Sequence, residues 1–283
     1  MKMWGMGLIA LIMAGGAQAL QVVPAPPPPP PMLEWIAPDA ENTLVIETEF
    51  GSVIIELRPE MAPKGVERVK TLARQGFYDG LLFHRVIEGF VAQTGNPDNK
   101  DGGKSKLPNL PLEAVFRVDT IDAQVAKRPG LTEGLIGATQ VIVANPLPGQ
   151  EGKPTRAWGT FCKGVVGMGH DDANDTANSE LFIMLGDVPR LDKDYTVIGR
   201  VIYDGADLAK LLPKGEPPLQ PASMRRVRVM ADMPLDEQPK IEIANTKHAR
   251  FKEWLNWERS YYRHGWLESY SICKTIVPTR TVP

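Results

Sequence analysis

The chain has 283 residues, of which 43% are hydrophobic and 23% charged, as in a globular protein with one core and some additions. Its 32 basic residues nearly balance its 34 acidic residues, which gives a formal net charge of -2. This balance excludes the strong positive field that recruits nucleic acid or anionic membranes, so we expect neither as a partner.

The first 19 residues have the pattern of a secretory signal peptide. Lys2 precedes an apolar run from Met6 to Met13, and the small-residue sequence Ala17-Gln18-Ala19 follows. The alternative, a membrane anchor, requires an apolar run of about 20 residues, which this segment lacks. We therefore expect cleavage after residue 19, export, and no stable membrane insertion of the mature protein.

Residues 20–41 are predicted to form a linker. The unbroken run from Pro26 to Pro31 has no backbone N–H groups and favours extended polyproline II, which makes a stiff spacer. A docking site for a proline-reading partner is the alternative interpretation of the same run.

The segment from residue 42 onward has the pattern of a β-rich domain. Two β-rich runs flank Gly51-Ser52, which predicts a hairpin, and the spacing of Val66, Val69 and Leu72 predicts an amphipathic helix over 64–75. A second helix is predicted over 204–212. Further strands are predicted at Leu82–Val86, Phe90–Thr94, Phe161–Met168, Glu180–Leu185, Val197–Ile202 and Met224–Val229. Many short strands with few helices indicate a β-barrel or a sandwich.

Residues Phe77 to Gly95 read FYDGLLFHRVIEGFVAQTG, which resembles the signature strand pair of the cyclophilins. Three later segments match that family in the same order, at Gly164–His170, Asn178–Ile183 and Leu191–Val201. The resemblance covers a domain at 42–232 and implies a peptidyl-prolyl cis/trans isomerase of the bacterial exported, periplasmic branch. It also implies a mainly β fold, a closed antiparallel barrel capped by two helices.

The chemistry of this reaction sets clear demands on a site. An Xaa-Pro bond isomerises over a barrier of about 18–20 kcal/mol because resonance makes the C–N bond partly double. Rotation breaks that resonance and leaves a lone pair on the prolyl nitrogen. A catalyst therefore needs an apolar socket for the proline ring, a fixed donor beside the nitrogen, and an anchor for the neighbouring carbonyl. No metal or cofactor is required, and we expect none.

Arg85 and Gln93 are the predicted catalytic residues. A guanidinium stays charged at physiological pH and presents several N–H donors in one plane, whereas an arginine outside such a motif would simply be a surface strand residue. Gln93 resembles the family's glutamine that holds a substrate carbonyl and orients the arginine. The resemblance also implies substrate-binding residues at Phe90, Val91, Gly169, His170, Glu180, Phe182, Leu191 and Tyr195. The substrates it implies are unfolded or partly folded polypeptides that contain proline.

Three positions depart from the family pattern. Glu180 stands where the family commonly has glutamine, so we expect an acid that pairs with Arg85, holds it or competes for it. Leu181 replaces a frequent aromatic residue. These departures keep open a second hypothesis, a non-catalytic binding module or chaperone that uses the same groove to hold proline-containing segments.

Arg190 stands where cyclosporin-sensitive members have tryptophan, so we predict that this protein binds cyclosporin weakly. Titration calorimetry should give a dissociation constant above about 1 μM, which corresponds to a binding free energy weaker than about -8 kcal/mol. A sub-micromolar constant would contradict this prediction.

Two segments lie outside the family pattern. Residues 117–157 are rich in proline and glycine and predict a loop insertion at the surface, with a role in gripping clients as the alternative. Residues 233–283 form a C-terminal extension. Its aromatic residues recur near helical spacing, which predicts an amphipathic helix that either packs against the barrel or presents a client surface. The aromatic face comprises Phe251, Trp254, Leu255, Trp257, Tyr261 and Tyr262.

The remaining candidates for chemistry are the cysteines and histidines. Cys162 and Cys273 can pair in an oxidising compartment or remain two separate thiols, and the sequence leaves both readings open. The four histidines show no metal-ligand spacing. His84 alternates with its strand neighbours Phe83 and Arg85, which predicts that its side chain fills the barrel interior. No oligomeric state is predicted.

Overall fold

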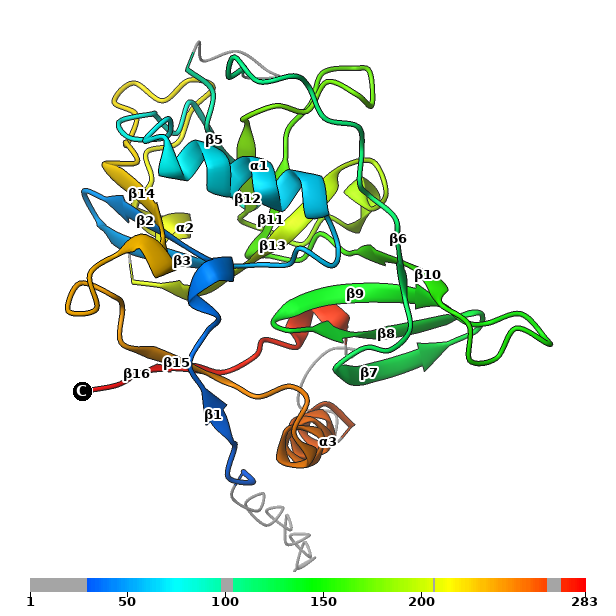
Figure 1. Ribbon diagram of the computed structural model, residues 1–283. Coiled ribbons are helices and arrows are strands. Elements are labelled where there is room, and N and C mark those ends of the chain that lie inside the picture. The colour runs from blue at the N-terminus through cyan, green and yellow to red at the C-terminus, as the bar shows by residue number, and fades with distance from the viewer. Residues whose placement is uncertain (1–29, 98–103, 206, 264–270) are drawn as a thin grey trace, which may run out of the picture.

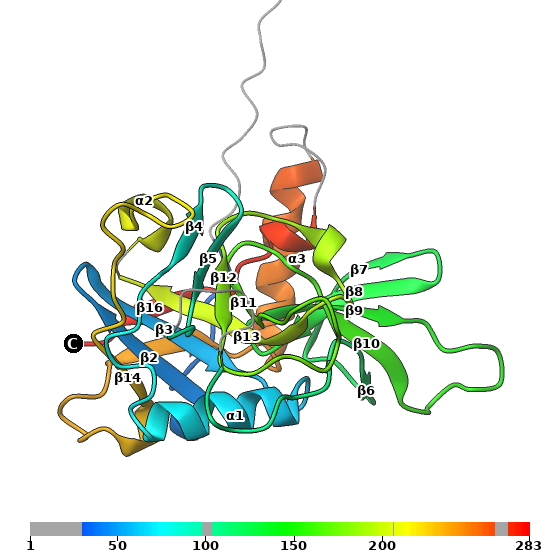
Figure 2. The ribbon, with the colours of Figure 1, turned by 90° about the horizontal axis from the view of Figure 1, so that it is seen from above.

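A computed structural model describes residues 30–97, 104–205, 207–263 and 271–283. The predicted signal peptide and most of the proline run lie outside these ranges. An eight-stranded antiparallel sheet, in the order β14-β2-β3-β13-β11-β12-β5-β4, curls into a barrel (Figure 2). Its strands are β2 (Thr43–Thr48), β3 (Gly51–Leu57), β4 (Arg85–Ile87), β5 (Val91–Thr94), β11 (Val165–Met168), β12 (Leu181–Met184), β13 (Thr196–Asp204) and β14 (Arg226–Val229).

Backbone hydrogen bonds join the two edges of this sheet. The amide of Gly80 donates to the carbonyl of Met224 at 2.6 Å, and the amide of Met224 donates to the carbonyl of Leu81 at 2.8 Å. The amide of Phe83 donates to the carbonyl of Ala222, also at 2.8 Å. These bonds link the residues that precede β4 to those that precede β14, so the predicted antiparallel barrel is confirmed.

Two helices pack on the barrel, as predicted. The first, α1 (Pro63–Arg74), buries the three side chains that predicted it, together with Ala73. Its first amides have no capping side chain nearby in sequence, and the carboxylate of Glu113 accepts hydrogen bonds from Lys64 and Gly65 at 3.2 and 2.9 Å instead. The second, α2 (Leu208–Leu211), is shorter than the predicted 204–212 because β13 continues to Asp204.

The insertion at 117–157 is not a loop, which corrects the expectation from its composition. It carries most of a second antiparallel sheet in the order β6-β10-β9-β8-β7. Most of its prolines and glycines lie between the strands, such as Pro129-Gly130, whereas Val125, Leu135 and Val141 on the strands are fully buried. The strands are β6 (Phe116–Val118), β7 (Ala123–Arg128), β8 (Leu131–Ile136), β9 (Thr139–Ala144) and β10 (Thr155–Gly159).

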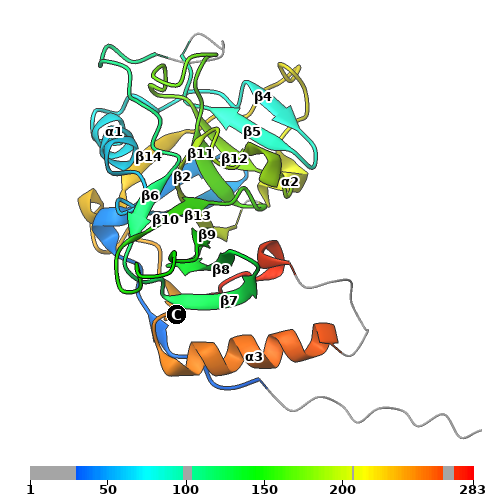
Figure 3. The ribbon, with the colours of Figure 1, turned by 90° about the vertical axis from the view of Figure 1, so that its right-hand side faces the viewer.

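Segments from near the two ends of the described chain pair in a third sheet, in the order β1-β15-β16. Near the N-terminal end, β1 (Trp35–Ile36) pairs with β15 (Ile241–Ala244), which also pairs with β16 (Thr279–Thr281) near the C-terminus. Residues 35–36 of the predicted linker are therefore part of the fold. The extension also forms α3 (Ala249–Arg263), and the inserted sheet lies between the barrel and α3 (Figures 1 and 3).

The aromatic face of α3 packs into the protein interior. Phe251 and Leu255 are 1% and 2% exposed, and Trp254 is 8% exposed. They share one hydrophobic cluster with residues of the inserted sheet and of the barrel. The helix is confirmed, and its face is a packing surface rather than an exposed client surface; the side chains of Tyr261 and Tyr262 lie outside the described part of the chain. Within the described ranges, no helix has both the length and the apolar character that crossing a bilayer requires.

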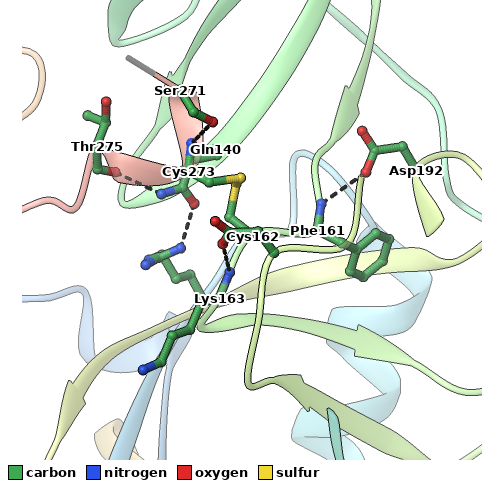
Figure 4. The surroundings of a disulfide bond; sticks show 10 residues. Gln140, Phe161, Cys162, Lys163, Asp192, Ser271, Cys273 and Thr275 are labelled. Atoms are coloured by element: carbon green, nitrogen blue, oxygen red, sulfur yellow. Dashed lines mark hydrogen bonds between the residues drawn. A yellow bond between two sulfur atoms is a disulfide. The ribbon is translucent and has the colours of Figure 1, made fainter. Parts of the chain in front are cut away.

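A disulfide between Cys162 and Cys273 ties the extension to the barrel (Figure 4). Beside it, the buried guanidinium of Arg200 on β13 donates to Oε1 of Gln140 on β9 at 2.6 Å. Nε2 of Gln140 donates to the carbonyl of Thr275 at 2.8 Å. Burial lowers the pKa of Arg200 to about 10. One covalent bond and one chain of hydrogen bonds thus join the barrel, the inserted sheet and the C-terminal segment.

Glu258 on α3 should make the stability of the fold depend on pH. Burial raises the pKa of its carboxyl from 4.5 to about 7, and Oε2 has no hydrogen-bond partner among the described residues. Because the folded pKa exceeds the unfolded one, the folded state binds the extra proton, and stability falls as pH rises from 4.5 through about 7. We expect Glu258→Gln to raise the midpoint of urea unfolding at pH 8 and to change it little at pH 5. Glu253→Gln, on the exposed side of α3, is the control; an unchanged Glu258→Gln midpoint at pH 8 would contradict the prediction.

Candidate active site

One row of residues crosses four neighbouring strands of the barrel. The strand register pairs Arg85 on β4 with Gln93 on β5, and Gln93 with Phe182 on β12. It then pairs Phe182 with Gly167 on β11. Because directly paired residues of antiparallel strands point to the same face of a sheet, the side chains of Arg85, Gln93 and Phe182 lie next to one another.

A cavity of about 890 Å³ opens onto this row. All ten predicted site residues line it, namely Arg85, Phe90, Val91, Gln93, Gly169, His170, Glu180, Phe182, Leu191 and Tyr195. Three further carboxylates that were not predicted also line it, those of Asp171, Asp172 and Glu216. The barrel therefore brings together residues from segments more than 100 positions apart in the sequence.

Two acceptors hold the guanidinium of Arg85. Nε donates to Oε2 of Glu216 at 2.6 Å, and Nη1 donates to Oε1 of Gln93 at 2.5 Å. Its central carbon lies 5.6 Å from the ring centroid of Phe90. Nη2 has no hydrogen bond to any described residue, so this nitrogen of a fixed, planar cation stays available to a substrate.

Glu180 contacts Gln93 and not Arg85. Its Oε1 accepts a hydrogen bond from Nε2 of Gln93 at 2.9 Å, while Oε2 lies 3.5 Å from Nδ2 of Asn96 and from Nε2 of the buried His84. A carboxylate can only accept, so it holds the amide nitrogen of Gln93 toward itself and leaves the amide oxygen for Arg85. A direct pair between Glu180 and Arg85, one of the expectations above, is not formed; the acid orients the arginine through Gln93.

Two glycines make room for these side chains. A Cβ atom on Gly169 would lie 2.1 Å from Oε1 of Glu180, and one on Gly167 would lie 2.5 Å from a ring carbon of Phe182. Both distances are far below van der Waals contact. A side chain at 167 or 169 would have to displace the ring or the carboxylate, so both glycines leave the space that these groups occupy.

Aromatic rings form an apolar socket beside Arg85. The ring of Phe182, only 4% exposed, stands edge-on to Tyr195 with centroids 5.5 Å apart. Phe161 stacks on the same Phe182 ring, also with centroids 5.5 Å apart. The carboxylate of Asp192 accepts from the amide of Phe161 at 2.9 Å, and burial raises the pKa of that carboxyl. Such a rigid apolar wall suits the ring of a proline.

His170 belongs to the wall of the cavity. Its ring stacks on Tyr195 with centroids 4.5 Å apart. Its two ring nitrogens lie 2.5 and 2.8 Å from the backbone carbonyls of Asp171 and Asp194. Both nitrogens thus face backbone carbonyls rather than the space that a substrate would fill.

Arg190 lies at the edge of the same cavity. It belongs to the short 3-10 helix Pro189–Leu191, and its guanidinium carbon lies 5.6 Å from the ring centroid of Phe90. A charged group therefore lies over the Phe90 ring, where a tryptophan would add apolar surface. The prediction of weak cyclosporin binding stands on this difference.

Glu216 was missed because no local signal marks it. It lies 131 residues after Arg85, in a segment whose composition only predicts a turn. Reciprocal backbone hydrogen bonds between Val86 and Gly215, both 2.9 Å long, bring it beside the guanidinium. Asp171 and Asp172, in contrast, directly follow the predicted Gly169 and His170, so their position alone could have identified them.

We expect Glu216→Gln to lower kcat/KM for an Xaa-Pro peptide by about two- to fivefold, because a half-exposed charge pair that fixes Arg85 is weakened. Exchange of the peptide can be followed by NMR with matched enzyme concentrations. Glu242→Gln is the control, since Glu242 pairs with Arg280 away from the cavity. An unchanged rate constant for Glu216→Gln would show that Glu216 does not position the arginine.

A second cavity, of about 580 Å³, lies between the inserted sheet and α3. Lys252 and Arg259 of α3 and Asp122 are among the residues that line it. The carboxylate of Asp122 already accepts hydrogen bonds from Gly137 and Thr246, at 2.8 and 3.3 Å. This cavity lacks the combination of an apolar socket and a fixed donor, so the candidate active site is the one on the barrel.

Comparison with known proteins agrees with this geometry. Residues 43–230 match the family described as cyclophilin type peptidyl-prolyl cis-trans isomerase/CLD. A probable peptidyl-prolyl cis-trans isomerase of Brucella suis is 36% identical over 190 residues, which covers 63% of this chain and 75% of that protein. The crystal structure of cyclophilin AquaCyp293 from Hirschia baltica superposes with a TM-score of 0.74 at 27% identity, over 87% of this chain and 92% of that one. With its barrel, its cavity and these matches, the chain belongs to the cyclophilin-type peptidyl-prolyl cis-trans isomerases.

Proposed function

We propose that Arg85 carries the isomerisation in this protein. The proline ring of a substrate enters the aromatic socket, which places the prolyl nitrogen beside the guanidinium. As the Xaa-Pro bond twists, the nitrogen gains a lone pair, and an N–H of Arg85 donates to it. This hydrogen bond exists only near the twisted state, so it lowers the barrier instead of merely tightening substrate binding.

Gln93 and Glu180 have supporting roles in this proposal. The observation that carries it is the continuous chain of hydrogen bonds from Glu180 through Gln93 to Arg85, with one guanidinium nitrogen left over. Because the cation is fixed before the substrate arrives, little reorganisation is needed as the bond twists. A module that only held proline segments would need the socket but no free donor next to it.

NMR exchange spectroscopy on an Xaa-Pro peptide tests the catalytic role. The wild-type protein should speed cis/trans exchange at sub-stoichiometric concentration. Chemical-shift changes of the peptide, which report binding, without faster exchange would instead favour the alternative, a groove that holds proline-containing segments without turnover.

We further propose that the substrates are exported polypeptides that are still folding. Slow Xaa-Pro isomerisation takes tens of seconds and can limit folding, so an isomerase is useful where new chains fold. Two features support export: the leader pattern at residues 1–19, and the Cys162–Cys273 disulfide, because disulfides persist mainly in oxidising compartments such as the periplasm.

Cell fractionation combined with thiol alkylation tests the location. We expect the protein in the periplasmic fraction, shortened by about the length of a signal peptide, with both cysteines protected from alkylation until a reductant is added. Full-length protein in the cytoplasmic fraction with two reactive thiols would overturn the proposal. The folding role is tested separately, by adding the purified protein to a substrate whose refolding is limited by one proline.

A further inference from the structure

Two carboxylates that are unpaired within the described part of the chain line the active-site cavity. Asp171 is half-buried and Asp172 is exposed, and both line the cavity. Neither side chain has an ion pair or hydrogen bond with another residue in the described ranges. The backbone that carries them is held in place, because the amide of Asp171 donates to Oγ1 of Thr176 at 2.9 Å, and that hydroxyl donates to the carbonyl of Ala173.

The charges around the cavity do not balance. Among the described residues that line it, Arg85 is the one permanent cation, and Glu216 already pairs with it at 2.6 Å. Glu180 is buried and holds Gln93. This leaves Asp171 and Asp172 uncompensated. Arg190, at the edge of the cavity over the ring of Phe90, offsets at most one of them.

We propose that Asp171 and Asp172 make this isomerase prefer polypeptides that carry lysine or arginine close to the proline. Residues that flank a proline in the socket must pass the mouth of the cavity, where they meet this negative field. A basic side chain gains a favourable interaction there and an acidic one is repelled. The inference rests on the proposed isomerase function of the same site, and it names the class of segment on which that function acts best.

The experiment uses peptides that are identical except for the residues flanking one Xaa-Pro bond, with lysine, alanine or glutamate on either side. The kcat/KM of each is measured by NMR exchange with the full mature chain. At low salt we expect the lysine peptides to exceed the glutamate peptides by about fivefold, since two partly exposed charges each contribute modestly. At about 1 M salt the ratio should approach one, because the Debye length falls to about 3 Å.

Variants assign the preference to the two residues. In Asp171→Asn/Asp172→Asn, the lysine-to-glutamate ratio at low salt should fall close to one. Asp236→Asn removes one charge from an exposed loop residue that does not line the cavity, and it should keep the wild-type ratio. The ratio compares two peptides on one enzyme, so a general loss of activity in a variant cancels.

Each outcome decides the inference. Equal rates for lysine and glutamate peptides at low salt, or a preference for glutamate, would overturn it while leaving the isomerase function intact. A double variant that keeps the wild-type ratio would also overturn it, because the preference would then come from other groups. If no peptide of any charge is accelerated, the proposed function itself fails, and the charge preference fails with it.

Discussion

Replacing Arg85 with alanine is expected to lower kcat/KM for an Xaa-Pro peptide by about 10²- to 10³-fold, the loss that follows removal of one preorganised donor from a transition state. The structure gives the reason. The guanidinium is fixed by Glu216 and Gln93 and has one nitrogen free. Alanine removes the only permanent cation among the described residues that line the cavity. NMR exchange at equal concentrations of wild type and variant measures the effect.

Two further variants make this result specific. Arg85→Lys keeps a positive charge but lacks the planar set of donors, so it should recover only part of the lost activity. Arg280→Ala removes an arginine that pairs with Glu242 far from the cavity, and it should keep wild-type activity. Unfolding midpoints show whether each variant is folded. A folded Arg85→Ala protein with wild-type exchange rates would remove Arg85 from the mechanism.

Loss of the Cys162–Cys273 disulfide is expected to lower the free energy of unfolding by about 2–5 kcal/mol, the range found for native disulfides. The cysteines are 111 residues apart in sequence, so the bond restricts a large loop of the unfolded chain. In the folded state it anchors the C-terminal segment, which follows α3 and contacts the inserted sheet through Gln140. Urea unfolding of wild type and of Cys162→Ala/Cys273→Ala measures the difference.

Reduction of the wild type gives an independent comparison. Adding a thiol reductant should lower the unfolding midpoint of the wild type toward that of the double variant and leave the double variant unchanged. The double variant also avoids a free thiol that could form disulfides between molecules. Equal midpoints for oxidised wild type and the double variant would contradict the prediction and would show that packing alone holds the extension.

Local patterns predicted a β-rich domain, and the resemblance to the cyclophilins added the closed barrel and the candidate site residues. A strand repeats every two residues and a helix every three to four, so α1 and the strands of the barrel could be recognised from apolar spacing. The site residues occur in short motifs, Phe83-His84-Arg85 and Asn178-Ser179-Glu180 among them. The first motif leads into β4 and the second directly precedes β12. Both strands pair with β5, and so the predicted residues line one cavity.

The insertion and the extension were predicted less well, because the inserted sheet and α3 bury apolar side chains against each other. The inserted sheet packs between the barrel and α3 (Figure 3), so its strands show no single apolar face, and the prolines and glycines of the segment indicated a loop. The aromatic face of α3 was predicted, but its partner, the inserted sheet, was not. Which surface covers an amphipathic helix is a question of long-range packing, and periodicity carries no information about it.

The sequence by itself therefore predicted the family, because four motifs in one order resemble the cyclophilins, and that resemblance supplied the candidate site residues. Tertiary structure alone decided how those residues are connected. Glu216 reaches Arg85 only through barrel closure, Glu180 acts through Gln93 because Gly169 leaves space for it, and Cys162 meets Cys273 only after the C-terminal segment returns to the barrel. Each of these contacts joins distant parts of the chain, and distance in space cannot be read from distance in sequence.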